Sequence, residues 1–405
     1  MKIFPSLHQS VVGAVALSFV MLLGACGGDT KTGSNGTGSV PQQTSDPFTA
    51  SGTLNSSGPV SIGSLSISDL IALIQLNTQL GRSPTELRLG MQAEISGSIS
   101  SGGNAILIVT NANSITAQSA AVGPVSTINP ATSQFTMLSL TVQMDQNTIF
   151  EGLPSLAALR TGDRVEVYGL PQPAPSSILA TRLILLPANS SAPVELLGNV
   201  SNLGTSQFSL QGIQVAAGNA QVSIGGVQAL PGAPLVSVGL NGRVRAVGTY
   251  DPASNTLVAT QVVGGLTPVR NDNSILVLEG LVQSVTTPGR FRLSDADVDA
   301  TAVGGASAIV GSRVEVRGRK LAGVLVASEY RLITPGERTI FTIQGDITDF
   351  ASIAAFRVRG ESLSANGATF TGGTAADLAN GKRVRIRAVA GAGVLNAMEV
   401  AFVAP

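Results

Sequence analysis

Short stretches in which apolar and polar residues alternate recur along the chain. The clearest pair is Gly162 to Gly169 (GDRVEVYG) and Gly311 to Gly318 (GSRVEVRG), where valine alternates with charged residues. A period of two predicts a β-strand with one buried face and one face in water. We call this element the repeat strand. Its looser copies are Gly90 to Gly97 (GMQAEISG), Asn241 to Gly248 (NGRVRAVG) and Gly381 to Ala388 (GKRVRIRA).

Other elements accompany the repeat strand in a fixed order, and their recurrence predicts tandem modules. A Gly-x-Val or Gly-x-Ile opening comes first, a Phe-led strand follows, and a Leu-x-Ala strand ends the unit. Successive copies are roughly 70–80 residues apart, a small-domain spacing. The openings are at Gly123, Gly198, Gly280 and Gly345, the Phe-led strands at Phe135, Phe208, Phe291 and Phe356, and the Leu-x-Ala strands at Leu257, Leu325 and Leu395. We predict module 1 at 47–118, module 2 at 119–188, module 3 at 193–267, module 4 at 274–335 and module 5 at 338–405.

Each module is predicted to hold about five short strands, with a helical turn before the fourth. Ser155 to Arg160 and Ala375 to Asn380 are candidates for that turn. Five strands with a helix between the third and fourth predict an OB-like β-barrel, and a five-stranded SH3-like barrel is the alternative. Module 1 carries a longer insert, Ser68 to Leu80, which is predicted to be a helix with Ser68 as its cap. The apolar stripe of this helix consists of Leu70, Leu73, Ile74 and Leu80.

The alternation also predicts which residues of a repeat strand face the barrel interior. In module 4, Val314 and Val316 are expected to face inward, against Phe291 and Leu293 of the preceding Phe-led strand. Glu315 is then expected to face solvent. A slip of one residue would exchange the two faces, so this register tests the whole fold prediction.

The order Gly-x-Val, Phe-x-Leu, repeat strand, Leu-x-Ala resembles a repeated module of proteobacterial lipoproteins, the domain of unknown function 5666 family. The resemblance covers most of the chain after residue 46. It implies an architecture and a location in the cell envelope. It implies no activity, cofactor or catalytic residue.

The first residues have the three-part pattern of a secretory signal. A polar start with Lys2 precedes an apolar run from Val11 to Leu23, shorter than the roughly 20 residues of a transmembrane helix. The string Leu22 to Cys26 (LLGAC) resembles the lipobox of bacterial lipoproteins. The resemblance implies a signal peptide at 1–25 and an acyl anchor, such as palmitate, on Cys26. An ordinary signal cut near Ala25 that leaves a free thiol is the alternative.

The residues that follow Cys26 bear on location and reach. Gly27 and Gly28 stand where inner-membrane lipoproteins carry an aspartate, so the resemblance implies the outer membrane, facing the periplasm or the cell surface. Residues 26–46 hold the acylated cysteine and a stretch rich in Gly, Ser and Thr. Such a stretch buries too little apolar surface to fold, and it is predicted to be a flexible tether.

Composition excludes several kinds of chemistry. The chain has one histidine, His8, and one cysteine, Cys26, and both belong to the predicted signal and anchor. The predicted mature chain therefore cannot form a Ser-His-Asp triad or a site with His or Cys metal ligands, and we expect no cofactor and no enzymatic activity. The formal net charge is zero, so no global field favours nucleic acid.

Two groups of side chains are candidate sites. Alternating Asp295, Asp297 and Asp299 place three carboxylates on one face, which could suit Ca²⁺, although Ala300 and Ala306 replace the glycine and glutamate of an EF-hand loop. Solvated strand positions are the favoured interpretation. Two arginine stripes could form a ligand face of OB barrels, with salt-bridged barrel exterior as the plainer interpretation. The stripes are Arg313, Arg317 and Arg319, and Arg383, Arg385 and Arg387.

These observations predict a non-enzymatic, lipid-anchored envelope protein of repeated β-barrels that acts as a binding protein or as a spacer and scaffold. Its expected partners are the membrane, through Cys26, and an envelope protein or polysaccharide. The alternatives are a module that binds carbohydrate or an anionic oligomer, and a hydrolase that works through carboxylates alone.

Overall fold

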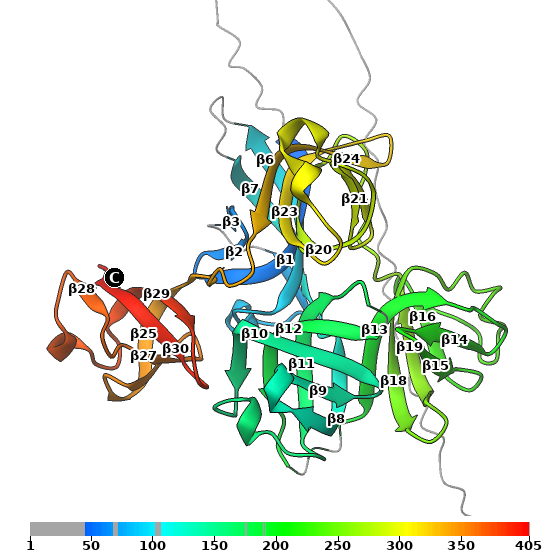
Figure 1. The fold of residues 1–405 in the computed structure, drawn as a ribbon, viewed down its shortest axis with the longest axis horizontal. Coiled ribbons are helices and arrows are strands. Elements are labelled where there is room, and N and C mark those ends of the chain that lie inside the picture. Colours follow the sequence, from blue (N-terminus) through cyan, green and yellow to red (C-terminus); the bar gives the residue numbers. More distant parts are fainter. Residues whose placement is uncertain are drawn as a thin grey trace, which may run out of the picture. The chain divides into compact units, whose positions relative to one another are not determined.

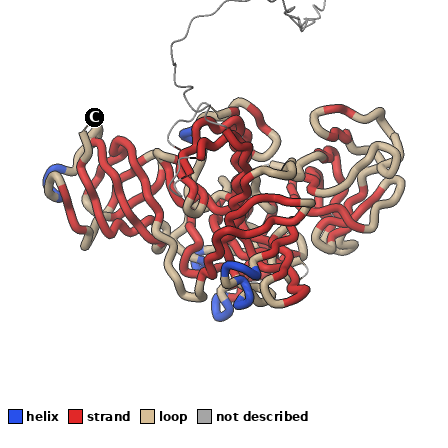
Figure 2. Tube along the Cα trace, turned by 90° about the horizontal axis from the view of Figure 1, so that it is seen from above, coloured by secondary structure: helices blue, strands red, loops and turns tan. Residues whose placement is uncertain are grey.

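The structure is a computed structural model, and it describes residues 45–67, 72–101, 107–174, 176–188, 190 and 192–404. This part of the chain is all-β, with helical structure limited to short 3-10 turns (Figures 1 and 2). It includes no helix that is long and apolar enough to cross a membrane. The predicted signal peptide, Cys26 and the tether up to residue 44 lie outside the described residues.

Module 2 shows the architecture most simply, in a closed barrel of five strands. They are β8 (Ala121–Asn129), β9 (Gln134–Met137), β10 (Leu140–Glu151), β11 (Arg164–Pro171) and β12 (Ser177–Leu185). The first strand, β8, pairs antiparallel with β9 and β11, while β9 pairs with β10 and β11 pairs with β12. The third strand, β10, runs parallel to the fifth, β12, and closes the barrel.

Modules 3, 4 and 5 repeat this circuit, with the third and fifth strands again parallel. Module 3 has β13 (Val194–Ser201), β14 (Gln207–Leu210), β15 (Ile213–Ala216), β16 (Gln221–Ile224), β17 (Val227–Gln228), β18 (Arg243–Asp251) and β19 (Thr256–Gly264). Module 4 has β20 (Ile275–Thr287), β21 (Arg290–Leu293), β22 (Ala296–Asp299), β23 (Arg313–Leu321) and β24 (Val324–Ile333). Module 5 has β25 (Phe341–Ser352), β26 (Ala355–Val358), β27 (Glu361–Ser364), β28 (Thr369–Thr371), β29 (Arg383–Ala390) and β30 (Leu395–Phe402).

The strand order confirms the OB-like prediction over the SH3-like alternative. An OB barrel is a Greek key rather than a simple up-and-down barrel, so strands distant in sequence must pair. Here the first strand pairs with the second and the fourth, and the third pairs with the fifth. A single 3-10 turn takes the place of the OB helix before the fourth strand, as in η3 (Leu156–Ala158) and η6 (Ala375–Asp377).

Module 1 follows the same order with an interrupted third strand. Its strands are β1 (Ser45–Ser57), β2 (Val60–Ile62), β3 (Leu65–Ile67), β4 (Leu73–Leu76), β5 (Gln79–Leu80), β6 (Gln92–Ser101) and β7 (Leu107–Ala117). The helix predicted over Ser68 to Leu80 is wrong where the structure describes it. Leu73 to Leu76 run parallel to the fifth strand, β7, and Ile74 alone of the predicted stripe's described members is buried. The apolar residues of this segment have the spacing of a helix face by coincidence. The segment forms a strand instead, because its backbone pairs with the sheet.

The cores confirm the predicted register. Val314 and Val316 are fully buried, and they belong to one apolar cluster with Phe291 and Leu293. The other Phe-led strands behave in the same way, since Phe135, Phe208 and Phe356 are buried in their own barrels. Burying each such side chain contributes roughly 1.5–3 kcal/mol, so the recurring apolar residues stabilise each module.

The glycine that ends the repeat strand has a packing role. In module 4 a Cβ on Gly318 would lie 2.0 Å from the carbonyl oxygen of Val326, and Gly248 of module 3 stands equally close to Val258. Both glycines sit at β-bulges, where the pairing between the fourth and fifth strands shifts by one residue. A bulge bends the strand, so this glycine lets the sheet curl tightly enough to close.

The modules are joined by backbone pairing of their first strands. Residues 48–51 of β1 run parallel to 275–278 of β20, and Ser56 and Ser57 pair with β25. The first strands of modules 2 and 3, β8 and β13, also pair, but they run antiparallel. Modules 1, 4 and 5 therefore share one 18-stranded sheet, and modules 2 and 3 share one of 12 strands.

The expected exposure of Glu315 is wrong, and the join between modules gives the reason. Glu315 does point away from the core of its own barrel, but its exposed fraction is only 8%. Its carboxylate accepts hydrogen bonds of 2.8 Å from both the backbone N–H and the hydroxyl of Ser64 in module 1. Alternation predicts which side of a strand a residue occupies, and a neighbouring module decides whether that side meets water.

Candidate functional site

The outward face of the repeat strand is where modules meet. Its two outward side chains are the third and fifth residues of each copy. In modules 1 to 4 many of these side chains contact another module, whereas Arg383 and Arg385 of module 5 bond only within their own module. The third residues are Gln92, Arg164, Arg243, Arg313 and Arg383, and the fifth are Glu94, Glu166, Arg245, Glu315 and Arg385.

Arg182 of module 2 is the centre of one junction. Its side chain is 1% exposed and donates to the Leu89 carbonyl of module 1 at 2.7 Å. It also pairs with Glu361 of module 5 at 3.2 Å and with Glu151 of its own module. Burial lowers the pKa of this arginine, but the two carboxylates outweigh that effect and raise it. One guanidinium thus ties three modules together.

Arg245 occupies a second junction. It is fully buried, pairs with Glu195 at 2.8 Å and donates to the side chain of Asn77 in module 1. It also donates to the carbonyl of Ser119, which connects modules 1 and 2. Burial lowers the pKa of Arg245, and Glu195 partly offsets this. Such interior ion pairs fix geometry more than they add stability.

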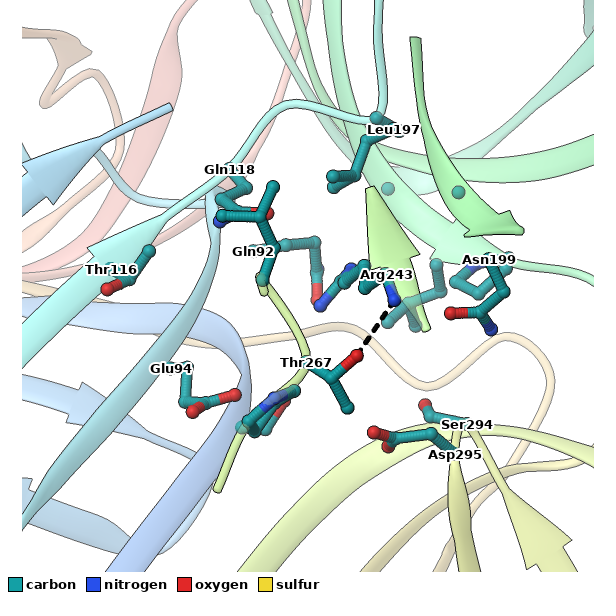
Figure 3. Close-up of a pocket in the computed structure, with 18 of the residues that line it drawn as sticks. Gln92, Glu94, Thr116, Gln118, Leu197, Asn199, Arg243, Thr267, Ser294 and Asp295 are labelled. Carbon is teal, nitrogen blue, oxygen red and sulfur yellow. Dashed lines mark hydrogen bonds between the residues drawn. The ribbon is translucent and has the colours of Figure 1, made fainter. Parts of the chain in front are cut away.

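Next to these junctions is a pocket of about 590 Å³ lined by four modules (Figure 3). Its walls come from β6 and β7 of module 1, residues 169–172, 174 and 176–178 of module 2, and β18 of module 3. The segment 265–270, which leads from module 3 towards module 4, and Asp295 of module 4 complete them. The lining is rich in amide and hydroxyl groups, and it includes no aromatic side chain among the described residues. The amide side chains include Gln92, Gln118, Gln172, Asn199, Gln211 and Gln283.

Glu94 is one of three carboxylic acids that line this pocket, with Glu279 and Asp295. It lies on β6, opposite Ser51 of β1 and Thr116 of β7. Burial raises the pKa of its carboxyl to about 7, against the opposing influence of Arg270 and Arg243 and with the support of Asp295. Within the described residues the Glu94 carboxylate forms no hydrogen bond or ion pair that would hold it ionised.

Two further polar groups face the pocket without a partner. The backbone N–H of Arg243 donates to the Thr267 hydroxyl at 2.8 Å (Figure 3), but its guanidinium has no ion-pair partner among the described residues. Gln118 is 8% exposed, and its side-chain oxygen accepts no hydrogen bond there. By contrast, Arg270 pairs with Asp295, and Glu279 pairs with Arg313.

Buried polar groups are normally satisfied, so orphaned ones mark a place for water or a ligand. The pocket has the volume of ordinary small-molecule sites, roughly 300–1,000 Å³. Its chemistry is a fixed positive charge, a carboxyl that titrates near neutral pH, and many neutral hydrogen-bonding groups. This set suits recognition of a small hydrophilic molecule.

Comparison with known families bears on two of the five barrels. The family model described as "Domain of unknown function (DUF5666)" matches residues 122–183 and 344–401. These two matches are consistent with a repeated DUF5666 domain. The first match spans the barrel of β8 to β12 and the second that of β25 to β30, so the resemblance indicated by the sequence motifs is confirmed in modules 2 and 5. No curated protein matches the chain.

The arginines of the two predicted stripes, in modules 4 and 5, do not line the pocket. Arg313 is nearly buried against Glu279, while Arg317 pairs with Glu329 and Arg319 with Asp46. Arg383, Arg385 and Arg387 do form one exposed face on β29. Their neighbours are Asp346, Gln344 and Glu399, at 3.6, 3.0 and 3.3 Å respectively.

The aspartate triplet does not converge on one point. Asp295 pairs with Arg270, Asp297 with Arg292 and Asp299 with Arg290. Hydrogen bonds from Thr301 lower the pKa of Asp299 and keep it ionised for that pair. Across the part of the chain that the structure describes, no three carboxylates gather in a way that could hold a metal ion.

Sequence reasoning missed Glu94, Gln118, Arg243 and Arg270. Two of them carried a signal, since Glu94 and Arg243 occupy outward positions of the repeat strand. The stripes stand out in the sequence because several arginines lie close together, whereas the pocket is lined by single charged residues from different modules. Only the assembly of the modules brings these residues together.

Proposed function

We propose that this chain is a non-enzymatic, lipid-anchored binding protein of the bacterial outer membrane, and that modules 1 to 4 together hold one pocket for a small hydrophilic ligand. The observation that carries the binding role is the pocket itself, where Arg243, Glu94 and Gln118 face one space without partners. The lipobox-like string that ends at Cys26 supports the anchor.

The way the modules are joined supports this role over that of a plain spacer. A spacer needs only a string of independent barrels. Here buried Arg182 and Arg245 fix barrels against one another, which costs desolvation that a string would avoid. Fixed walls are what a pocket made by four modules requires, because binding groups must stay in place to be effective.

The anchor gives the first prediction. A Cys26→Ser protein should lack the acyl chain and be recovered in the soluble fraction of the cell envelope, whereas the unaltered chain should fractionate with membranes. Mass spectrometry of the N-terminal peptide and membrane fractionation measure this. A Cys26→Ser protein that still fractionates with membranes would contradict the lipid anchor.

The pocket gives the second prediction. Thr116 lies on the pocket wall opposite Glu94, and Thr116→Phe should fill the space without removing a hydrogen bond made by its side chain. The protein carrying Cys26→Ser should be screened by thermal unfolding against neutral sugars, sugar acids and amino acids. Since a ligand at 100 times its Kd stabilises by about 2.7 kcal/mol, some members should raise the Tm, and Thr116→Phe should abolish the rise.

Ala401→Phe is the matched control. Ala401 faces Arg385 in module 5 as Thr116 faces Glu94 in module 1, but it lies away from the pocket. Ala401→Phe should keep the ligand-induced rise. Equal rises in both variants, or no rise with any compound in the unaltered protein, would overturn the binding role.

A further inference from the structure

The charges that face the pocket divide into satisfied and unsatisfied groups. Arg270 is neutralised by Asp295, and Glu279 by Arg313. Two charges remain, the guanidinium of Arg243 and the carboxyl of Glu94. They influence each other electrostatically, yet they form no ion pair with each other in the structure. The pocket is therefore built around an arginine without a counter-ion in contact.

Arg243 stays protonated at any physiological pH, because burial lowers its pKa from a very high starting value while Glu94 and Asp295 oppose the change. Glu94 is neutral below about pH 7. In that state the pocket has one unbalanced positive charge. A guanidinium presents a planar fork of donors that matches a carboxylate, so one carboxylate is the complementary group.

The other polar groups on the pocket wall indicate which groups the ligand carries besides its carboxylate. Amides and hydroxyls supply both donors and acceptors, and Gln118 offers an acceptor with no partner among the described residues. A ligand must therefore bring donors, such as hydroxyl groups, to these atoms. The wall has no described aromatic ring on which a flat apolar face could stack. The volume of about 590 Å³ suits a molecule of sugar size.

Building on the proposed function, we infer that the pocket takes a hydroxylated monocarboxylic acid of sugar size, whose carboxylate binds Arg243 and whose entry is coupled to a proton on Glu94. The proton comes from solvent, and it removes the negative charge that would otherwise repel the ligand. Above about pH 7 the ligand and the proton enter together, and the net charge of the pocket does not change on binding.

The test uses matched pairs of probes that differ in the carboxylate: D-galacturonate against D-galactose, and D-gluconate against D-glucitol. Calorimetric titration of the protein carrying Cys26→Ser should give tighter binding of an acid than of its neutral partner, by at least about tenfold. Because Glu94 titrates at about 7, affinity for the acid should fall about tenfold between pH 6 and pH 8.

Three variants assign the roles. Glu94→Gln should bind the acid at pH 6 as the unaltered protein does, and it should keep that affinity at pH 8. Arg243→Gln should lose at least about tenfold for the acid and little for the neutral sugar. Arg383→Gln is the matched control, since Arg383 holds the same position in the repeat strand of module 5 but is exposed, and it should change nothing.

The outcomes separate this inference from the proposed function. The inference is overturned if galactose or glucitol binds as tightly as the corresponding acid. It is also overturned if the affinity of the unaltered protein for the acid does not depend on pH. In both cases the pocket remains a binding site. If none of the four probes binds, the inference is overturned, and the wider screen with Thr116→Phe decides the proposed function.

Discussion

Replacing Arg182 with methionine should lower the free energy of unfolding by about 3–5 kcal/mol. The guanidinium is 1% exposed and is the charged partner of Glu361, which is itself 4% exposed. Without it, that carboxylate keeps only the Leu89 N–H, at 2.9 Å, and the Leu89 carbonyl loses its donor. A carboxylate left buried and unpaired is strongly destabilising. Urea unfolding followed by circular dichroism measures the loss.

Two further variants test whether the loss of stability comes from the Glu361 carboxylate, which Arg182→Met leaves buried without an ion-pair partner. Arg387→Met removes a guanidinium that pairs with Glu399 at the surface, and it should change stability by less than about 1 kcal/mol. The double variant Arg182→Met, Glu361→Leu should recover part of the loss, because it removes both buried charges. A single Arg182→Met variant as stable as Arg387→Met would show that this junction does not hold the modules together.

Replacing Glu94 with glutamine should stabilise the protein at pH 8 by about 3 kcal/mol and leave its stability at pH 4 almost unchanged. Burial raises the pKa of Glu94 from 4.5 to about 7 in the folded protein. Between these two values the folded chain holds a proton that the unfolded chain releases. Stability therefore falls as pH rises through this window, and the deficit is complete above about pH 7. Because glutamine does not ionise, the Glu94→Gln protein does not lose this stability as the pH rises.

The matched control is Glu315→Gln, at the same position of the repeat strand in module 4. Glu315 is buried too, but it accepts two hydrogen bonds from Ser64 and lies 3.5 Å from Arg331. Its replacement should destabilise by about 1–3 kcal/mol at pH 8. Unfolding measured from pH 4 to pH 8 distinguishes the two glutamates. A Glu94→Gln protein that follows the pH dependence of the unaltered chain would contradict the raised pKa.

The sequence was enough to predict the structural features that depend on a single strand or a single module. Alternation placed Val314 and Val316 inside, and the Phe-led and Leu-x-Ala motifs marked core residues such as Phe291 and Leu325. The order of these elements was enough for the OB-like barrel. Ile74 was misassigned because a spacing of three or four residues also arises by chance in a short strand.

What the sequence could not predict depends on contacts between modules. Glu315, Glu94 and Arg385 occupy the same position of the repeat strand, yet one meets Ser64, one a pocket and one water. The alternation of apolar and polar residues along one strand gives no information about which residues of a neighbouring barrel will face that strand. The pocket residues run from Ser51 to Asp295, and only the assembled chain brings these distant segments together.

The pairing of first strands has a consequence for how the chain is made. Strand β1 leaves the ribosome early, but its partners β20 and β25 follow more than 200 residues later. Modules 2 and 3 can complete their shared sheet from neighbouring segments, whereas one side of β1 must wait with its backbone groups unpaired. An unpaired edge during synthesis invites association with other chains, and contacts of long sequence separation form slowly. Of the five described barrels module 1 is made before the others, yet its surroundings stay incomplete until segments of modules 4 and 5 have been synthesised.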